Sequence, residues 1–364
     1  MLTIAREPAP APTARRSPAL AHLTPNWFAV VMGTGIIAVG AASLPVDLPG
    51  RDSIARGFWV LATAVLLLLS VAFAAHWVRH REQALGYARN PAMAPFYGAL
   101  PMAVLTVGAG AVGVGTEIFG PSAVVAAAVL WALGTVAGVT AAIIVPPRML
   151  SGGTPSPVWL MPVVPPMVSA ATGAALIPHL PEGQARLTML LGCYALFAMA
   201  LTAAVVTMAV VIGHLAQAGL PGVQAIPTMW IPLGVIGQSI AAANLLGRVS
   251  GTAVSSDAAA GLRAFGVAYG TGVAGIGALV LGFACLLTFR AAGRGLRFSM
   301  SWWSFTFPLG ACAVGAGALG MATDSVAVQW FSVALFALLL GIWTVVAANT
   351  ARGVWTRSLL VPAP

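Results

Sequence analysis

Residues 301–317 hold a proline and two phenylalanines inside a stretch that is apolar enough to cross a bilayer. Pro308 lies in its middle, and Phe305 and Phe307 come just before it. Proline removes a backbone donor and clashes with the preceding helical turn. Inside a membrane such a break is tolerated only where neighbouring protein or a water-filled cavity satisfies the freed groups. We therefore interpret residues 301–317 as one wall of a pore, with an aromatic side chain beside a bend.

Ionisable side chains, the usual source of chemistry, are nearly absent from the apolar stretches. His76, His80, His179 and His214 fall at the ends of such stretches or in loops, and His22 precedes the first one. An embedded enzyme would need a nucleophile, an acid–base pair or a set of metal ligands, and an ion-coupled pump usually carries a relay of Asp, Glu or His. A cation pore would need acidic side chains. We therefore predict that the chain is not an enzyme and binds no cofactor or metal.

An anion is the ligand class that remains for such a pore. Broken helices expose backbone N–H groups and positive half-helix ends, which hold substrate carboxylates in transporters. The alternative is an exporter of lipophilic cations or toxic compounds, which would need acidic or aromatic-cage residues inside the membrane. The tryptophans lie near the ends of the apolar stretches, where the aromatic belts of membrane proteins explain them. A structural or receptor-like membrane protein is a third class, but it requires no set of aligned helix breaks.

The elements that must position these residues are membrane-spanning helices. Of 364 residues, 59% are hydrophobic and 7% are charged, whereas soluble domains carry about 25% charged residues. About 20 apolar residues cross a bilayer, and the chain has ten stretches of this kind, at about 26–45, 56–78, 94–115, 121–144, 157–177, 187–214, 226–247, 262–289, 301–320 and 326–349. The prediction is an all-α polytopic membrane protein with a transmembrane domain at 25–349. A disordered cytoplasmic segment, 1–24, precedes it, and a short cytoplasmic tail, 350–364, follows.

The arginines predict the orientation of these spans. All 17 basic residues are arginine. If the N-terminus is cytoplasmic, twelve of them lie inside, and the five outside are Arg51, Arg56, Arg186, Arg248 and Arg263. The positive-inside rule then predicts a multi-pass protein of the cytoplasmic (inner) membrane with both termini in the cytoplasm. Because topology explains the net charge of +9, no nucleic-acid partner is predicted.

The odd-numbered spans carry prolines and glycines at mid-depth, whereas the even-numbered spans read as plain lipid-facing helices. This alternation is a weak repeat of one helical hairpin per unit and predicts five tandem hairpins around a central pore. The candidate pore-lining residues are Gly33, Thr34, Gly35, Pro101, Pro165, Gly173, Pro232, Gly234, Pro308 and Gly310. The alternative is that these residues only relieve packing, since proline and glycine are common in membrane helices.

Four short motifs carry a resemblance to a known family. The first span opens with Pro-Asn-Trp-Phe-Ala-Val-Val-Met-Gly-Thr-Gly at 25–35, and the others are Trp-Leu-Met-Pro-Val-Val-Pro-Pro at 159–166, Trp-Ile-Pro-Leu-Gly at 230–234 and Trp-Trp-Ser-Phe-Thr-Phe-Pro at 302–308. In this order they resemble the tellurite-resistance/dicarboxylate transporter (TDT) family. That family takes in the tellurite-resistance protein TehA, malate permeases, sulfite efflux pumps and plant slow anion channels.

The resemblance implies ten transmembrane helices around a pore in each protomer of a homotrimer. It also implies that a phenylalanine of the ninth helix closes the pore; the motif gives this role to Phe307, with Phe305 as the alternative. The implied substrate is a small anion, either a C4-dicarboxylate such as malate, or sulfite, or an inorganic anion such as chloride or nitrate. Tellurite resistance, where it exists, would follow from the anion permeability.

Overall fold

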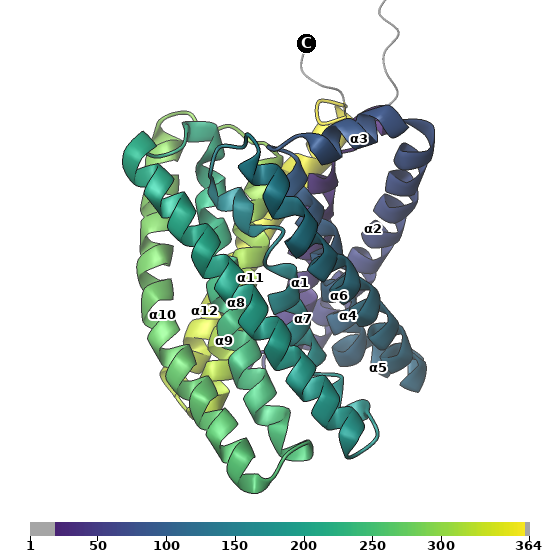
Figure 1. Cartoon of the computed structure of the whole chain (residues 1–364), viewed down its shortest axis with the longest axis vertical. Coiled ribbons are helices and arrows are strands. Elements are labelled where there is room, and N and C mark those ends of the chain that lie inside the picture. Colours follow the sequence, from purple (N-terminus) through teal and green to yellow (C-terminus); the bar gives the residue numbers. More distant parts are fainter. Residues whose placement is uncertain (1–18, 361–364) are drawn as a thin grey trace, which may run out of the picture.

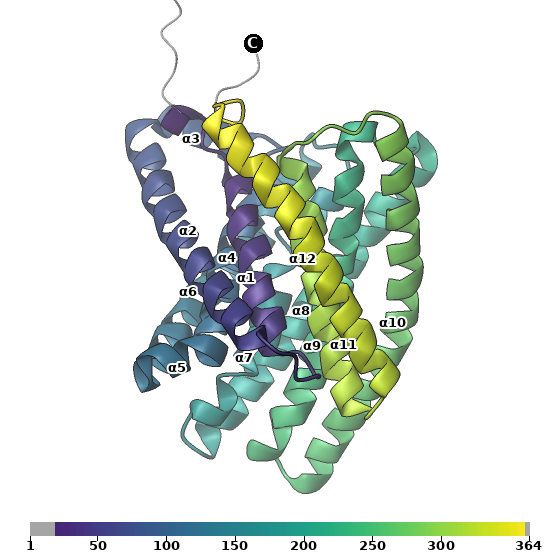
Figure 2. The ribbon, with the colours of Figure 1, turned by 180° about the vertical axis from the view of Figure 1, so that it is seen from behind.

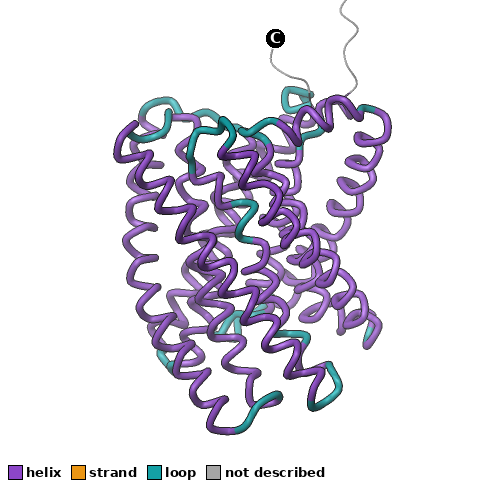
Figure 3. The backbone as a smooth tube through the Cα atoms, in the orientation of Figure 1, coloured by secondary structure: helices purple, strands orange, loops and turns teal. Residues whose placement is uncertain are grey.

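Helices make up the regular structure of this protein. The computed structural model describes residues 19–360, and no strand occurs among them (Figure 3). Nine helical segments of this part are long and apolar enough to cross a membrane: Pro25–Ala42, Arg51–Arg79, Ala94–Phe119, Pro121–Leu150, Gln184–Ala218, Val223–Thr252, Ser256–Gly293, Met300–Ala322 and Val326–Trp355. The prediction of an all-α polytopic membrane protein is therefore confirmed.

The fifth predicted span is not a continuous helix, which is why nine such segments are found rather than ten. Residues 157–179 consist of the 3-10 turn η5 (Pro157–Leu160), the helix α7 (Pro165–Gly173) and the 3-10 turn η6 (Ile177–His179). Its five prolines explain the interruption, because each removes a backbone donor and fixes its own φ. No piece of this segment is long enough to cross a bilayer alone as a regular helix.

Two sets of helices alternate along the chain. The longest helices, drawn along the sides of the bundle in Figures 1 and 2, are α2 (Arg51–Arg79), α6 (Pro121–Leu150), α8 (Gln184–Ala218), α10 (Ser256–Gly293) and α12 (Val326–Trp355). Between 11% and 28% of the most apolar window of each of these helices is buried. The corresponding share is 72% to 83% for the other four spanning segments. These segments contain α1 (Phe28–Ala42), α4 (Ala99–Gly110), α9 (Ile231–Val249) and α11 (Thr306–Ala322). The spans rich in proline and glycine are therefore the inner ones, and the plain spans present their apolar side chains outward.

Each inner helix starts as a tight 3-10 turn and then widens into an α-helix. The preceding turns are η2 (Pro25–Trp27), η3 (Ala94–Gly98), η7 (Val223–Trp230) and η9 (Met300–Phe305). Pro101, Pro232 and Pro308 fall in the first turn of α4, α9 and α11. A proline is tolerated there because the first N–H groups of an α-helix have no partner inside it. The prolines thus mark a change of helix type at the start of each of these three helices.

The ends of the transmembrane domain are more ordered than the sequence suggested. Within the segment predicted as disordered, Ala19–His22 forms the turn η1, and the carbonyl of Leu20 lies 2.8 Å from Nδ1 of His76. The last helix runs to Trp355, past residue 349. Residues 1–18 and 361–364, which hold the rest of the two predicted tails, lie outside the described part. A short helix that the sequence did not predict, α3 (Arg81–Arg89), crosses the same end of the bundle (Figure 1).

Candidate functional site: a pathway between the inner helices

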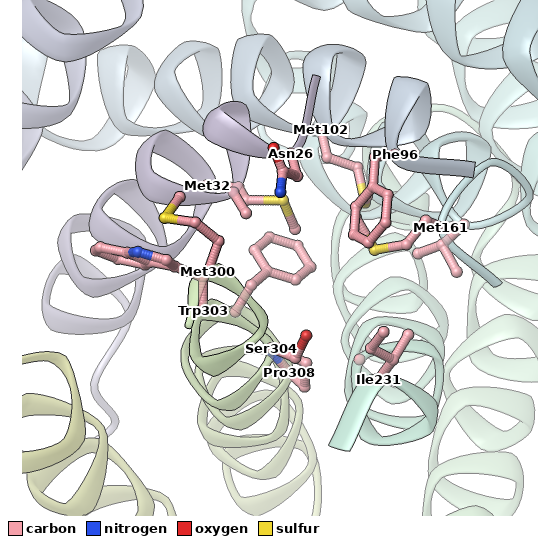
Figure 4. Close-up of a pocket in the computed structure, with 14 residues that line it drawn as sticks. Asn26, Met32, Phe96, Met102, Met161, Ile231, Met300, Trp303, Ser304 and Pro308 are labelled. Carbon is pink, nitrogen blue, oxygen red and sulfur yellow. The ribbon is translucent and has the colours of Figure 1, made fainter. Parts of the chain in front are cut away.

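A small cavity lies at the level where the inner helices change type. Its volume is about 40 Å³, and each of the five inner segments contributes to its wall, with Met32, Met102, Met161, Ile231 and Phe307 among the lining residues. Figure 4 shows the side chains of Met32, Met102 and Met161 gathered around this space. We call it the proline-level cavity. A water molecule needs about 10–15 Å³ measured in this way, so the cavity holds a few waters at most.

A larger cavity, which we call the vestibule, lies further along the same five segments. Its volume is about 390 Å³, and its lining residues include Ile36, Thr106, Val168, Gln238 and Val314, one from each inner segment. In every segment these residues follow, by four to seven positions, those that line the proline-level cavity. The two cavities are therefore successive spaces on one axis, with a packed layer between them.

Glycines allow the packed layer to be tight. A side-chain carbon placed on Gly310 of α11 would lie 2.5 Å from Ile36 of α1. One placed on Gly33 would collide with Thr306 and Trp303, and one on Gly35 would lie 2.8 Å from Thr106. These three predicted residues lie in helix contacts within or beside the layer.

The two phenylalanines of η9 and α11 have different surroundings. Phe307 is buried and lines the proline-level cavity together with Pro308. Phe305 is buried in an aromatic cluster: its ring centroid lies 5.3 Å from that of Trp230 and 5.8 Å from that of Trp302, both edge to face. Phe305 is not among the residues that line the cavity. Of the two phenylalanines, Phe307 alone lines the cavity.

Two further predicted residues, Gly234 and Pro308, line the proline-level cavity. Their helices are close there, because a side-chain carbon on Gly234 would lie 3.6 Å from Pro308.

The other predicted lining residues point toward outer helices. Oγ1 of Thr34 accepts a hydrogen bond from Nε1 of Trp343 on α12. Pro101 and Pro165 lie beside Gly138 of α6, where a side-chain carbon would come 3.7 Å from Pro101 and 2.8 Å from Pro165. None of these three predicted residues lines either cavity.

Gly173 and Pro232 likewise face outward. A side-chain carbon on Gly173 would lie 2.6 Å from the sulfur of Cys193 on α8 and 3.0 Å from Nε1 of Trp131 on α6. Pro232 lines an apolar groove between α8, α9 and α10. The prolines and glycines of these spans therefore serve helix packing as well as the central space.

Sequence comparison identifies the protein family to which this chain belongs. The family described as voltage-dependent anion channel, SLAC1, matches residues 22–351. The chain belongs to the voltage-dependent anion channel family. The match confirms the family that the four motifs indicated, whose members are transporters and channels.

Two kinds of relatives align with almost the whole chain. An uncharacterised transporter of Methanocaldococcus jannaschii is 26% identical over 345 residues, which is 92% of this chain and 94% of the relative. The sulfite efflux pump SSU1 of Arthroderma otae is 27% identical over 353 residues, 94% of this chain and 93% of the pump. The sulfite efflux pump SSU1 of Trichophyton rubrum is also 27% identical, over 354 residues and the same shares.

The charges of the vestibule agree with membership of an anion channel family. Arg51 and Arg248 are among its lining residues, and no carboxylate of the described residues is. Arg51 is largely neutralised, because its Nε lies 3.3 Å from Asp47 and 3.4 Å from Asp52. Arg248 has no carboxylate within 4.0 Å in the described part of the chain.

Sequence reasoning missed Met32, Met102, Met161 and Arg248 as lining residues. The methionines carried no distinguishing pattern, because methionine is a common filler of apolar cores. Arg248 was placed outside, one residue past the span 226–247, yet α9 continues to Val249 and Arg248 lines the vestibule. The one available indication was its spacing of four residues from Asn244, which places both on one helix face. Among residues 19–360, no three His, Cys, Asp or Glu side chains gather where a metal ion could bind.

Proposed function

We propose that this protein conducts small anions across the membrane through the axis of its five inner segments, as a passive or weakly coupled pathway. The observation that carries the proposal is the pair of cavities, since the same five segments line both spaces at successive depths. The charge of the vestibule favours anions over the lipophilic cations of the alternative function. Its lining includes arginine and, among the described residues, no carboxylate.

Residues 157–179 would serve as the tenth crossing, which completes five hairpins. Trp159 packs with Val145 and Val211, near the later ends of α6 and α8. Ile177 packs with Leu190, near the start of α8. The segment therefore runs the length of α8 in the opposite direction, although no single helix spans it. Its prolines are compatible with a membrane because its freed groups face protein and cavity rather than lipid.

Sulfite is the first candidate substrate, because relatives that cover almost the whole chain are named sulfite efflux pumps. Malate and inorganic anions such as chloride are the other candidates. A liposome flux assay with each anion separately, with and without a pH gradient, decides among them. Sulfite flux above that of protein-free liposomes is expected; no flux of any anion, in the wild type or in the gate variant described next, would contradict the pathway.

Phe307 would be the gate. Its ring borders a cavity of about 40 Å³, too small for a hydrated anion, and the vestibule beyond is much larger. Phe307→Ala removes the ring from the narrow space, so flux should rise by at least tenfold. The matched control is Phe305→Ala, two residues away and also buried, which should leave flux per folded protomer near the wild-type value. A rise in Phe305→Ala with none in Phe307→Ala would transfer the gate to Phe305.

The arrangement in the membrane is part of this proposal. We infer that both termini are cytoplasmic, because twelve of the 17 arginines fall on their side of the alternating spans, as the positive-inside rule requires, and that the membrane is the cytoplasmic (inner) one. A homotrimer follows from the family resemblance, and the apolar outer faces of helices such as α6 and α8 offer contact area beside the lipid. Labelling of single cysteines introduced near residue 356 and near residue 254, from either side of the membrane, tests the orientation. Native mass spectrometry tests the trimer.

A further inference from the structure

Two arginines at the vestibule end of the bundle are unpaired. Three others at this end have carboxylate partners: Arg51 with Asp47 at 3.3 Å, Arg56 with Glu117 at 3.7 Å and Arg186 with Glu182 at 3.3 Å. In the described part of the chain, no carboxylate lies within 4.0 Å of Arg248 or Arg263. Both side chains are exposed, so they remain available to a dissolved anion.

The two unpaired arginines share one pocket. It has a volume of about 260 Å³ between α9, α10 and α11, and its lining includes Arg248, Arg263 and Asn244. The pocket shares Leu245, Arg248, Ala318 and Met321 with the vestibule. It is therefore a side chamber of the pathway, with Arg248 at the junction.

The neighbours of the two arginines do not neutralise them. Nη1 of Arg248 lies 4.0 Å from the sulfur of Met321, an uncharged neighbour. The two acidic residues that follow α9 and α11 along the chain, Asp257 and Asp324, do not line the pocket. Two guanidinium groups held around one space repel each other, and an anion between them removes that repulsion.

The amide oxygen of Asn244 is a buried acceptor without a donor among the described residues. Nδ2 of Asn244 donates to the carbonyl of Ile240 at 2.9 Å, whereas Oδ1 is buried and accepts no hydrogen bond from the described residues. A buried acceptor without a donor costs about 1–3 kcal/mol. Asn244 thus adds an unsatisfied acceptor to the wall of the pocket that holds the two arginines.

We propose that Arg248 and Arg263 form a binding site for a small oxyanion at the vestibule end of the pathway. The planar fork of a guanidinium matches two oxygens of one anion and gives paired, charge-assisted hydrogen bonds. A chloride ion offers no such pair of oxygens, so the site selects oxyanions of the sulfite and carboxylate type over halides. This inference rests on the proposed anion pathway. It adds a selective site in a pocket that Phe307, the proposed gate, does not line.

Equilibrium binding tests the site without any measurement of flux. The full-length protein in detergent is titrated calorimetrically with sulfite and with malonate, which separates an inorganic oxyanion from a dicarboxylate. Arg248→Gln and Arg263→Gln should each weaken binding of the preferred probe about tenfold, the worth of one charge-assisted hydrogen bond. The matched control is Arg56→Gln, which removes the same charge at the same end of the bundle but away from the pocket, and it should change affinity less than twofold.

A lysine variant separates geometry from charge. Arg263→Lys keeps the charge but loses the fork, so it too should bind sulfite more weakly than the wild type. Full affinity in Arg263→Lys, together with displacement of sulfite by an equal concentration of chloride, would overturn the oxyanion selectivity. Unchanged affinity in both glutamine variants, or an equal loss in Arg56→Gln, would overturn the site itself.

Flux in the same variants distinguishes failure of the site from failure of the pathway. If Phe307→Ala raises sulfite flux while the glutamine variants bind sulfite as the wild type does, the pathway holds and the site is overturned. If the glutamine variants lose binding while no variant carries any anion, the site stands and the pathway is overturned.

Discussion

Trp343 and Thr34 join the last helix of the protein to the first. Nε1 of Trp343 on α12 donates a hydrogen bond to Oγ1 of Thr34 on α1 across 3.1 Å, although the two residues are 309 positions apart in the chain. Oγ1 of Thr34 in turn donates to the carbonyl of Val30 at 2.7 Å. The hydroxyl thus uses its donor within α1 and accepts the bond from the outer helix, so Thr34 helps to close the bundle.

Replacement of Thr34 by valine should destabilise the protein without changing anion flux. Valine has nearly the same shape but no hydroxyl, so the half-buried indole N–H of Trp343 loses its acceptor, at a cost of about 1 kcal/mol. Thr34→Ser keeps the hydroxyl and is the control. The measurement is the temperature at which the monodisperse peak is lost in size-exclusion chromatography after heating. Equal temperatures for the valine, serine and wild-type proteins would show that this bond does not hold the bundle closed.

The distinction between inner and outer helices could be predicted from sequence because it depends on composition. Prolines and glycines interrupt the inner spans, and long runs such as 60–69 mark a helix that contacts lipid. The family could be predicted as well, since its four motifs lie in those inner spans.

The side that each residue faces could not be predicted in this way. Thr34, Pro101 and Gly173 lie in inner spans but face outer helices, because the rotation of a helix depends on tertiary packing that a local motif does not encode. The prolines predicted that the odd-numbered spans, the fifth included, are interrupted. The division of the fifth span into two 3-10 turns and one short helix escaped prediction, because apolar composition alone does not reveal 3-10 turns. Arg248 escaped as a lining residue because the end of α9 was placed too early.

Two glycines of α9, one helical turn apart, should differ in how much alanine substitution lowers the stability of the protein. A side-chain carbon on Gly237 would lie 2.6 Å from the carbonyl oxygen of Ala311, a backbone atom of α11 that cannot move alone. Gly237→Ala should therefore separate the two helices and lower the stability by about 1–3 kcal/mol. Gly234→Ala meets only Pro308 at 3.6 Å, an ordinary contact, and should keep the wild-type stability.

For anion flux, the variant expected to show an effect is Gly234→Ala, the one that keeps its stability. The methyl group of Gly234→Ala enters the proline-level cavity, so it should reduce sulfite flux when the gate has been removed by Phe307→Ala. Thermal stability and liposome flux, normalised to folded protein, are measured for both variants in that background. Loss of stability in Gly234→Ala, or wild-type stability in Gly237→Ala, would contradict the packing described for α9 and α11.

A carboxylate placed in the vestibule should oppose anion flux. Gln238 is buried and lines the vestibule midway along α9. Gln238→Glu has nearly the same shape, and a unit charge roughly 8 Å from the passing anion costs about 2 kcal/mol at an effective dielectric constant of about 20. In the Phe307→Ala background, flux should therefore fall by at least tenfold. Nitrate is the suitable probe because it stays monoanionic throughout the pH range tested.

The pH dependence of the Gln238→Glu variant provides the decisive comparison. At a pH low enough to protonate it, the introduced side chain is neutral and flux should approach that of the Gln238 parent. As the pH rises the side chain becomes charged and nitrate flux should fall, while the parent and Gln238→Leu show no such step. Nitrate flux in Gln238→Glu that matches the parent from pH 5 to pH 9 would mean that anions do not pass this residue, and the pathway along the five inner segments would have to be abandoned.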